Sequence, residues 1–161
     1  MNIRPALDAD HAAIWSILEP VIRAGETYTL PYDLTAREAL EYWFAQGHTV
    51  FVAEIDEGRI AGTYYMRANQ RGGGSHVANC GYVTAQWASG HGVARAMCAH
   101  SLDFARAQGF RAMQFNFVVS TNTRAVKLWE RAGFAVVGRL PDAFHHPTLG
   151  FVEALVMYRM I

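Results

Sequence analysis

The sequence predicts one α+β domain, in which a central mixed β-sheet of about seven strands carries helices on both faces. Two observations favour this fold class. Segments with the period of a strand and segments with the period of an amphipathic helix follow one another in the order β-α-α-β-β-β-α-β-α-β-β. The chain has 161 residues, shows neither an internal repeat nor a low-complexity linker, and is long enough for a sizeable core. We therefore predict a single domain over residues 1–161.

A short strand over residues 2–4, followed by a helix, is predicted at the start of the chain. We expect Pro5 to stop the strand, Asp8 to cap the helix and Gly25 to end it. The apolar residues of the helix recur at the spacing of one helical face: Ile14, Ile17, Leu18 and Val21. A loop over residues 26–34, rich in hydroxyl groups and aromatic rings, then leads to the second helix.

The second helix is predicted to begin at a capping box formed by Thr35 and Glu38. The residues expected to face the core are Leu40, Trp43 and Phe44. Two strands over residues 49–55 and 60–67 follow, and the turn Glu57-Gly58 between them predicts a hairpin.

The middle of the chain is predicted to contain a strand, a glycine loop and a helix. Residues 72–74 are three glycines that turn the chain into a central strand over residues 76–84. After the glycine loop, a helix is indicated by apolar residues of one face, and Gly109 ends it. Those residues are Val93, Met97 and Phe104, with Ala94, Cys98, Leu102 and Ala105 beside them. A strand over residues 113–119 comes next.

The last quarter of the chain is predicted to form a helix and two strands. The helix covers residues 123–132 and a strand over residues 134–139 follows it. A loop containing His145 and His146 then precedes the last strand, over residues 151–158. These two histidines are adjacent, which does not give the i, i+4 spacing of zinc ligands on a helix, and we predict no metal site.

The glycine loop before the helix at Val93 predicts an anion site. The first N–H groups of a helix have no partner within the helix, and they lie at the positive end of its dipole. Val93-Ala94 follows Gly92 where a nucleotide P-loop has Lys-Ser/Thr, and Arg95 occupies the third glycine position of the dinucleotide fingerprint. The loop therefore indicates an anion other than these nucleotides, or an ordinary helix entry.

Two motifs in the correct order resemble the GNAT superfamily of N-acetyltransferases. Residues 89–94, Ser-Gly-His-Gly-Val-Ala, resemble its acetyl-CoA pyrophosphate loop, Arg/Gln-x-x-Gly-x-Gly/Ala, with Ser89 where Arg or Gln is typical. Residues 121–134 resemble its segment Asn-x-x-Ala-x-x-hydrophobic-Tyr-Glu-x-x-Gly-Phe. The resemblance implies the GNAT acyl-CoA N-acyltransferase fold, with a splayed pair of parallel strands and acetyl-CoA as cosubstrate. The cofactor-binding residues that it implies are Val83, Thr84, Ser89, Gly90, His91, Gly92, Val93, Ala94, Arg95, Asn122 and Trp129.

The resemblance also implies a substrate site between the splayed strands. Asn79 and Asn116 stand in contexts similar to the azetidine-2-carboxylate (proline-analogue) acetyltransferases, whose corresponding asparagines hold a small amino-acid substrate. The alternative is a buried asparagine satisfied by the backbone. Tyr28 and Tyr65 are expected to be aromatic walls of this site, with core packing as the alternative. Strand alternation predicts Met113, Phe115 and Phe117 on one face and Gln114, Asn116 and Val118 on the other.

The reaction implied by the resemblance is direct attack of a neutral amine on the thioester. Backbone N–H groups near Val83 and Thr84, where the central strand of the family is bulged, are the expected oxyanion donors. His76 is a candidate general base, and an ordinary surface or core histidine is the alternative. Trp129 occupies the position of the family's tyrosine acid, and an indole N–H does not transfer a proton. Tyr82 or a water molecule is the alternative acid.

Composition narrows the classes of partner. Lys+Arg and Asp+Glu both number 14, so no long-range field attracts nucleic acid or an anionic membrane. No apolar run is long enough for a membrane span, and Asp8 and Asp10 argue against a secretory start. The two cysteines, Cys80 and Cys98, are expected to be reduced core thiols of a cytoplasmic protein. The apolar content of 52%, against 17% charged residues, leaves a surplus that a buried subunit contact would use, and a homodimer is expected.

These observations favour an acetyl-CoA-dependent N-acetyltransferase that acts on a small amine, with an amino acid or amino-acid analogue as the expected substrate. Two alternatives stay open. One is a phosphinothricin-type or other drug-detoxifying acetyltransferase. The other is a non-catalytic module that binds acyl-CoA, which Trp129 favours because it replaces the acid of the family.

Overall fold

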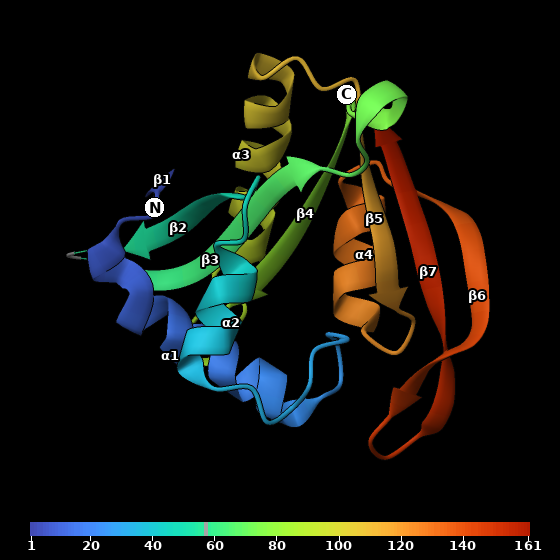
Figure 1. The fold of residues 1–161 in the computed structure, drawn as a ribbon, viewed down its shortest axis with the longest axis horizontal. Helices are drawn as coiled ribbons and strands as arrows, with labels where there is room; N and C mark the ends of the chain where they lie inside the picture. The colour runs from blue at the N-terminus through green and yellow to red at the C-terminus, as the bar shows by residue number, and fades with distance from the viewer. Residues whose placement is uncertain (57) are drawn as a thin grey trace.

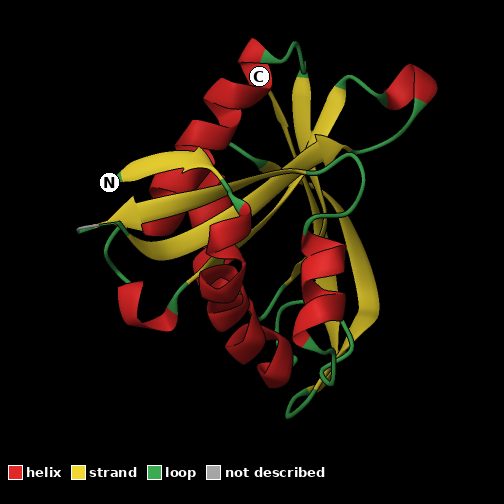
Figure 2. Ribbon diagram, turned by 60° about the vertical axis from the view of Figure 1, so that its left-hand side comes forward, coloured by secondary structure: helices red, strands yellow, loops and turns green. Residues whose placement is uncertain are grey.

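The computed structural model describes residues 1–56 and 58–161, and its element order is the predicted one (Figures 1 and 2). Glu57, in the predicted turn between the second and third strands, lies outside the described residues. The helices and strands are β1 (Asn2–Pro5), α1 (His11–Ala24), α2 (Ala36–Trp43), β2 (Thr49–Ile55), β3 (Arg59–Ala68), β4 (Val77–Thr84), α3 (Val93–Ala107), β5 (Ala112–Val119), α4 (Thr123–Arg131), β6 (Ala135–His146) and β7 (Gly150–Met160).

The strands form one sheet in the order β1-β2-β3-β4-β5-β7-β6. The β4–β5 pair is parallel, and the other neighbours are antiparallel. The parallel pair has only two matched positions, Val77 with Ala112 and Ala78 with Met113. Beyond them β4 and β5 diverge toward their carboxyl ends, as the two arrows in Figure 1 show. The predicted splayed pair is therefore confirmed.

Two helices cover each face of the sheet. Tyr65 of β3 packs its ring against Trp43 of α2 at 4.9 Å. Its neighbour Tyr64 points to the opposite face, where its hydroxyl lies 2.7 Å from His100 of α3. Tyr82 of β4 reaches both α3 and α4 on that second face. We call the two sides of the sheet the α1–α2 face and the α3–α4 face.

The first residues of α2 and α1 give one correct and one wrong prediction of a helix cap. The capping box at α2 is confirmed, because the Glu38 N–H donates to Thr35 and the Thr35 N–H donates to Glu38. The predicted cap of α1 is wrong. Asp8 lies in a 3₁₀ turn over Asp8–Asp10, and it is the Asp10 carboxylate that accepts the Leu7 N–H at 2.7 Å. The pairing of Asp10 with Arg4 of β1 decides this, because it holds the carboxylate at the helix entry.

A bulge in β5 corrects the predicted alternation of its side chains. Phe115 is opposite Met157 of β7, whereas Val118 is opposite Leu155, so three steps along β5 match two along β7. Val118 therefore joins the core beside Phe115. Phe117 instead turns toward Phe144 of β6, with ring centroids 6.3 Å apart.

The C-terminal hairpin is longer than predicted. β6 continues through His145 and His146, which we had expected in a loop, and pairs with β7 as far as Gly150. Two register shifts in the β6–β7 pairing accommodate the residues that β6 has in excess of β7. No helix in the described part of the chain is both long enough and apolar enough to cross a bilayer.

Candidate active site

The glycine loop forms an open cradle at the start of α3. Gly90 and Gly92 have positive φ angles of 87° and 78°, which side chains with a Cβ resist. A Cβ at either position would meet no atom within 4 Å, so the space above the loop is free. The first bond within the helix runs from the Ala96 N–H to the Gly92 carbonyl. The three preceding N–H groups, those of Val93, Ala94 and Arg95, thus have no acceptor within the helix.

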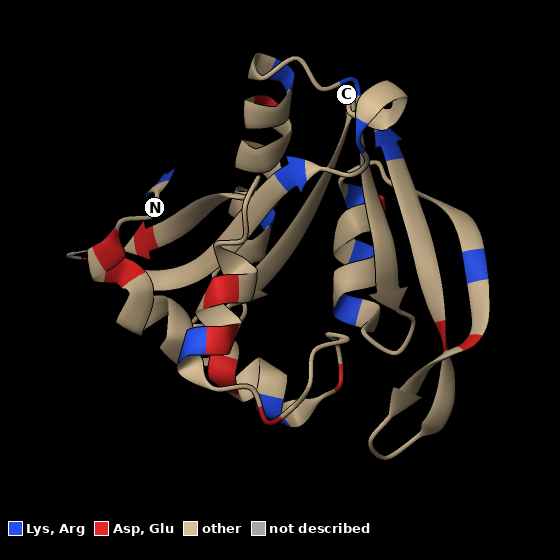
Figure 3. Cartoon of the chain, in the orientation of Figure 1, with Lys and Arg blue, Asp and Glu red and all other residues tan. Residues whose placement is uncertain are grey.

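Arg124 is a part of this loop that sequence reasoning missed. It lies in the first turn of α4, and its Nη1 donates to the Ser89 hydroxyl at 2.7 Å. A guanidinium therefore stands beside the position where the GNAT motif usually has Arg or Gln. α4 also carries Lys127 and Arg131, visible as blue bands in Figure 3. In the sequence, Arg124 is visible only as an arginine two residues after Asn122. Its contact with Ser89 depends on how the fold places α4 beside the glycine loop.

Asn122 and Trp129 hold α4 in place. The Asn122 side chain caps the helix by accepting the Ala125 N–H at 3.3 Å. Trp129 is 8% exposed, and its ring contacts those of Tyr82, Phe115 and Phe134 on the α3–α4 face. Trp129 packs the helix against the diverging strands, and it places an aromatic group where a tyrosine is typical.

The register of β4 decides which of its backbone groups face the gap. The Ala85 N–H donates to Ala61, and the Asn69 N–H donates to Val77, so the odd-numbered residues of β4 bond to β3. The even-numbered residues Cys80, Tyr82 and Thr84 consequently turn their N–H and C=O groups toward β5, which has already diverged. These groups form the open edge of β4.

The register also corrects the expected oxyanion donor. The β3–β4 pairing runs without a shift from Gly62–Thr84 to Ala68–Ala78, so β4 has no bulge near Val83. Val83 lies opposite Thr63 in a bonded pair, and its N–H points toward β3. Thr84 stays a candidate donor at the open edge, whereas Val83 supplies a side chain to the site.

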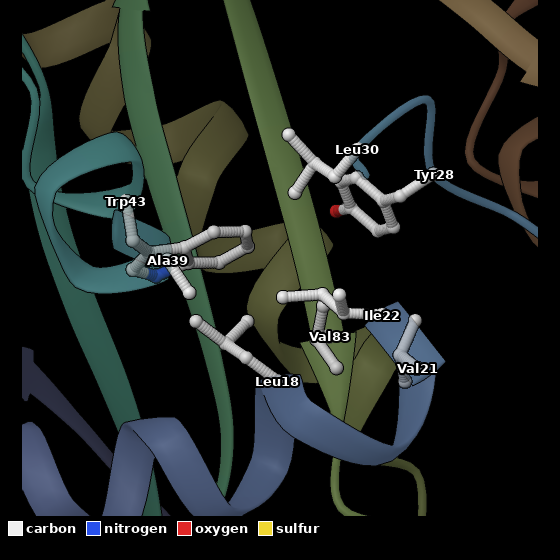
Figure 4. A pocket seen from close by; sticks show the side chains of 8 residues that line it. All are labelled: Leu18, Val21, Ile22, Tyr28, Leu30, Ala39, Trp43 and Val83. Atoms are coloured by element: carbon white, nitrogen blue, oxygen red, sulfur yellow. The ribbon is translucent and has the colours of Figure 1, made fainter. Parts of the chain in front are cut away.

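Tyr28 reaches the open edge from the loop after α1. Its hydroxyl donates to the Tyr82 carbonyl at 3.0 Å. The ring closes an apolar pocket on the α1–α2 face (Figure 4). Burial raises the pKa of Tyr28 far above its usual value, so the hydroxyl stays protonated. The pocket is lined by Leu18, Val21, Ile22, Tyr28, Leu30, Ala39, Trp43 and Val83.

A chain of amides lies where the strands separate. Asn79 is 6% exposed, and its Nδ2 donates to the Gln114 carbonyl at 2.9 Å, just beyond the last paired residues. Asn116 donates to Asn69 Oδ1 at 2.7 Å and accepts from Gln114 Nε2 at 2.8 Å. Asn79 and Asn116 thus both bond to Gln114, and the bond of buried Asn79 to a backbone carbonyl is the alternative named above for this residue. Asn69 and Gln114 were missed, because only the fold brings them to these two asparagines.

Tyr65 covers the α1–α2 face of β4 beside this amide chain. A Cβ on Gly81 would lie 2.5 Å from Tyr65 Cε1 and 2.9 Å from its hydroxyl oxygen, so the ring leans directly over Gly81. The hydroxyl also lies 3.3 Å from that of Tyr42. Arg67, the next residue on this face of β3, is opposite Asn79. Tyr65 thus lies one position along this face from Arg67, and its packing against Trp43 is the core packing named above as the alternative to an aromatic wall.

His76 lies apart from these groups. Its carbonyl accepts the Arg111 N–H, at the end where β4 and β5 are still paired. His76 lines a surface hollow with Arg111, Ala112, Tyr158 and Met160. The expected base is thus at the closed end of the strand pair, because β4 runs away from His76 toward the gap.

The remaining side chains that could act as an acid or a nucleophile are those of Tyr82, Cys80 and Cys98. The Tyr82 hydroxyl lies 2.7 Å from the Ser101 hydroxyl beneath α3, so it is not directed at the open edge. Burial raises the pKa of the Cys80 thiol to about 12 and that of Cys98 to about 11. Both stay protonated near neutral pH, which argues against a cysteine nucleophile. Within residues 1–56 and 58–161 no cluster of three potential metal ligands occurs.

Comparison with known proteins identifies this arrangement. A family model described as the acetyltransferase (GNAT) family matches residues 11–134. The chain belongs to this family. A GCN5-related N-acetyltransferase from Kribbella flavida has a similar structure, with 43% identity, a TM-score of 0.94, and coverage of 99% of this chain and 97% of that one. The predicted GNAT fold and the N-acetyltransferase class are therefore confirmed.

Two further proteins extend the comparison. N-acetyltransferase aca1 of Schizosaccharomyces pombe is 29% identical over 137 residues, which are 76% of this chain but only 66% of that protein. The chain thus spans slightly less than two thirds of this curated relative. The protein yncA of Salmonella typhimurium, solved with its cofactor acetyl-CoA, shares the fold with a TM-score of 0.85 and 22% identity. The match covers 99% of this chain and 93% of that one.

Proposed function

We propose that the chain transfers the acetyl group of acetyl-CoA to the amine of a small molecule, an amino acid or an amino-acid analogue. The observation that carries the proposal is that Asn79 and Asn116 both bond to Gln114, just beyond the last paired residues of β4 and β5. Few polar groups in an otherwise apolar cleft are typical of a site that orients a small ligand. Arg67, opposite Asn79, adds a cation suited to a substrate carboxylate.

The glycine cradle fits the diphosphate of acetyl-CoA. Its free space and the unpaired N–H groups at Val93–Arg95 suit an anion, and Arg124 supplies a positive charge beside Ser89. The even-numbered backbone groups of β4 suit the amide-bearing arm of the cofactor, which can bond to them like an added strand. When bound, the cofactor supplies an activated acetyl thioester.

The reaction that we propose is direct transfer. A neutral amine attacks the thioester carbonyl carbon, a C–N bond forms, and the C–S bond breaks to release the CoA thiolate. Tyr82 or Thr84 N–H groups at the open edge are candidates to stabilise the oxyanion. The raised pKa values of Cys80 and Cys98 support this route over an acyl-cysteine intermediate.

The test is release of the CoA thiol from acetyl-CoA in the presence of amino acids, proline analogues, phosphinothricin and polyamines. We expect the highest kcat/KM with an amino acid or its analogue. Asn116→Ala should lower kcat/KM for the best substrate about 10- to 100-fold, because an amide that orients the substrate is worth about 1–3 kcal/mol. The Kd of acetyl-CoA, measured by calorimetry, should not change.

The same panel decides between the alternatives. Preference for phosphinothricin would assign the chain to drug detoxification. Acetyl-CoA binding without turnover of any amine would indicate a non-catalytic acyl-CoA-binding module. Unchanged kinetics of Asn116→Ala would remove Asn116 from the substrate site.

A further inference from the structure

His48 lies on the α1–α2 face, where its ring packs on Tyr65 and its Nδ1 meets the Trp43 carbonyl. It comes immediately before β2, where Thr49 is opposite Met66 of β3. One step further along the same register brings His48 beside Arg67, and Arg67 is itself opposite Asn79. His48, Arg67 and Asn79 thus occupy one row across three strands.

The imidazole of His48 is held over this row by stacking. Its ring lies 4.2 Å from that of Tyr65, with an angle of 12° between the planes. The Tyr65 ring in turn leans over Gly81 of β4, so His48 and β4 contact the same tyrosine side chain. The imidazole thus lies on the same face and in the same row as Asn79, with Arg67 between them, and the Asn79 amide bonds to Gln114 where the strands separate.

A hydrogen bond fixes the tautomer of the His48 imidazole. Nδ1 lies 2.9 Å from the Trp43 carbonyl oxygen, and a carbonyl can only accept a hydrogen bond, so Nδ1 carries the hydrogen. In the neutral ring Nε2 then has the free lone pair. Among the hydrogen bonds of the described residues, none involves this atom.

We propose that His48 Nε2 is the general base that accepts a proton from the ammonium group of the substrate. This inference rests on the proposed function. The proton moves to Nε2, and the amine lone pair then forms the C–N bond as the C–S bond breaks. For a primary amine, one of the two protons left on the nitrogen then goes to solvent, the CoA thiolate takes up a proton from solvent, and His48 returns its own proton to solvent after the transfer.

The surroundings of His48 favour a neutral imidazole that is ready to accept this proton. Burial is the largest influence and lowers the pKa of His48 below its ordinary value; the hydrogen bond to the Trp43 carbonyl acts in the opposite direction, and the positive charge of Arg67 adds to the lowering. The other titratable groups packed around the ring are the hydroxyls of Tyr42 from α2 and Tyr65 from β3. Burial raises the pKa of Tyr65, so this hydroxyl is uncharged in the same pH range.

The variant His48→Asn separates the base from the structure. An asparagine amide can still donate to the Trp43 carbonyl in place of Nδ1, but it has no group that accepts a proton near neutral pH. For the wild type we expect log kcat/KM to rise with pH and to level off above a pKa below about 6.5. For His48→Asn the rise should continue to the pKa of the substrate amine, and kcat/KM at pH 7 should fall about 100-fold.

Two further measurements keep this result interpretable. Calorimetry should give the same Kd for acetyl-CoA in both proteins. The imidazole NMR signal that is absent from His48→Asn should titrate below about 6.5 in the wild type. As a matched control, His145→Asn, at an exposed position in the C-terminal hairpin, should retain the wild-type pH profile.

The outcomes distinguish this inference from the function on which it rests. If the wild type acetylates an amine and His48→Asn keeps both its kcat/KM and its acid limb, His48 is not the base, whereas the proposed function stands. A His48 signal that titrates above about 6.5 would also overturn the inference. If the wild type acetylates none of the amines, both proposals fail.

Discussion

At the scale of single residues, Arg124 and Ser89 raise the question of where the acetyl-CoA loop obtains its positive charge. The two side chains are hydrogen-bonded across the mouth of the cleft. We expect Arg124→Gln to raise the Kd of acetyl-CoA about tenfold, because a charge-assisted contact to phosphate is lost. Adding Ser89→Arg to this variant should restore most of the affinity, since it returns the cation to the usual position of the motif.

Calorimetry on the single and double variants measures this exchange. The matched control is Arg131→Gln, which removes a positive charge from the other end of the same helix and should change the Kd less than about twofold. An Arg124→Gln protein with wild-type affinity would show that the backbone amides alone hold the diphosphate.

Gly81 is the residue whose size sets the position of Tyr65. A methyl group at this position would approach Tyr65 Cε1 to 2.5 Å. We therefore expect Gly81→Ala to lower the free energy of unfolding by about 1–3 kcal/mol, as overpacking does, and to displace the wall of the substrate site. Gly73→Ala is the control, because its new Cβ would meet nothing within 4 Å and should cost less than about 0.5 kcal/mol.

Urea denaturation of both variants gives the comparison. Equal midpoints for Gly81→Ala and the wild type would mean that the Tyr65 ring can move aside without cost. The contact over Gly81 would then have no part in fixing the site.

At the scale of elements, the sequence was most informative where a local pattern is sufficient. The capping box at Thr35 and the glycine entry to α3 depend on residues a few positions apart, and both were predicted correctly. The bulge in β5 was not, because it arises from the match between β5 and β7, which are far apart in the sequence. The same bulge is why the alternation of Phe115, Phe117 and Val118 failed.

The two histidines illustrate the same distinction. His76 adjoins the central strand in the sequence, but the glycine loop follows the other end of β4, so the cleft opens away from His76. The order of the motifs in the sequence already implies this position, because His76 comes before β4 and the glycine loop comes after it. His48 enters the row of Arg67 and Asn79 only through the β2–β3 register, and no local pattern indicates this register or the stacking on Tyr65.

At the scale of the whole molecule, the site depends on one divergence in an otherwise continuous sheet. The α3 and α4 N-termini bring the cradle and Arg124 together at the open end, while the α1–α2 face contributes Tyr28, Tyr65 and the amide chain (Figure 1). The predicted homodimer stays a prediction. The exposed apolar residues of the C-terminal hairpin offer it a surface: Val137, Leu140, Leu149, Phe151 and Met160.

The central claim is that acetyl-CoA is held by the cradle and by the open edge of β4. Amide hydrogen exchange by NMR, with and without acetyl-CoA, tests it most directly. We predict that acetyl-CoA slows exchange at Val93, Ala94 and Arg95 and at the even-numbered positions Tyr82 and Thr84, and leaves Val83, already bonded to β3, unchanged. Protection confined to other parts of the sheet, with no change at these amides, would contradict the account.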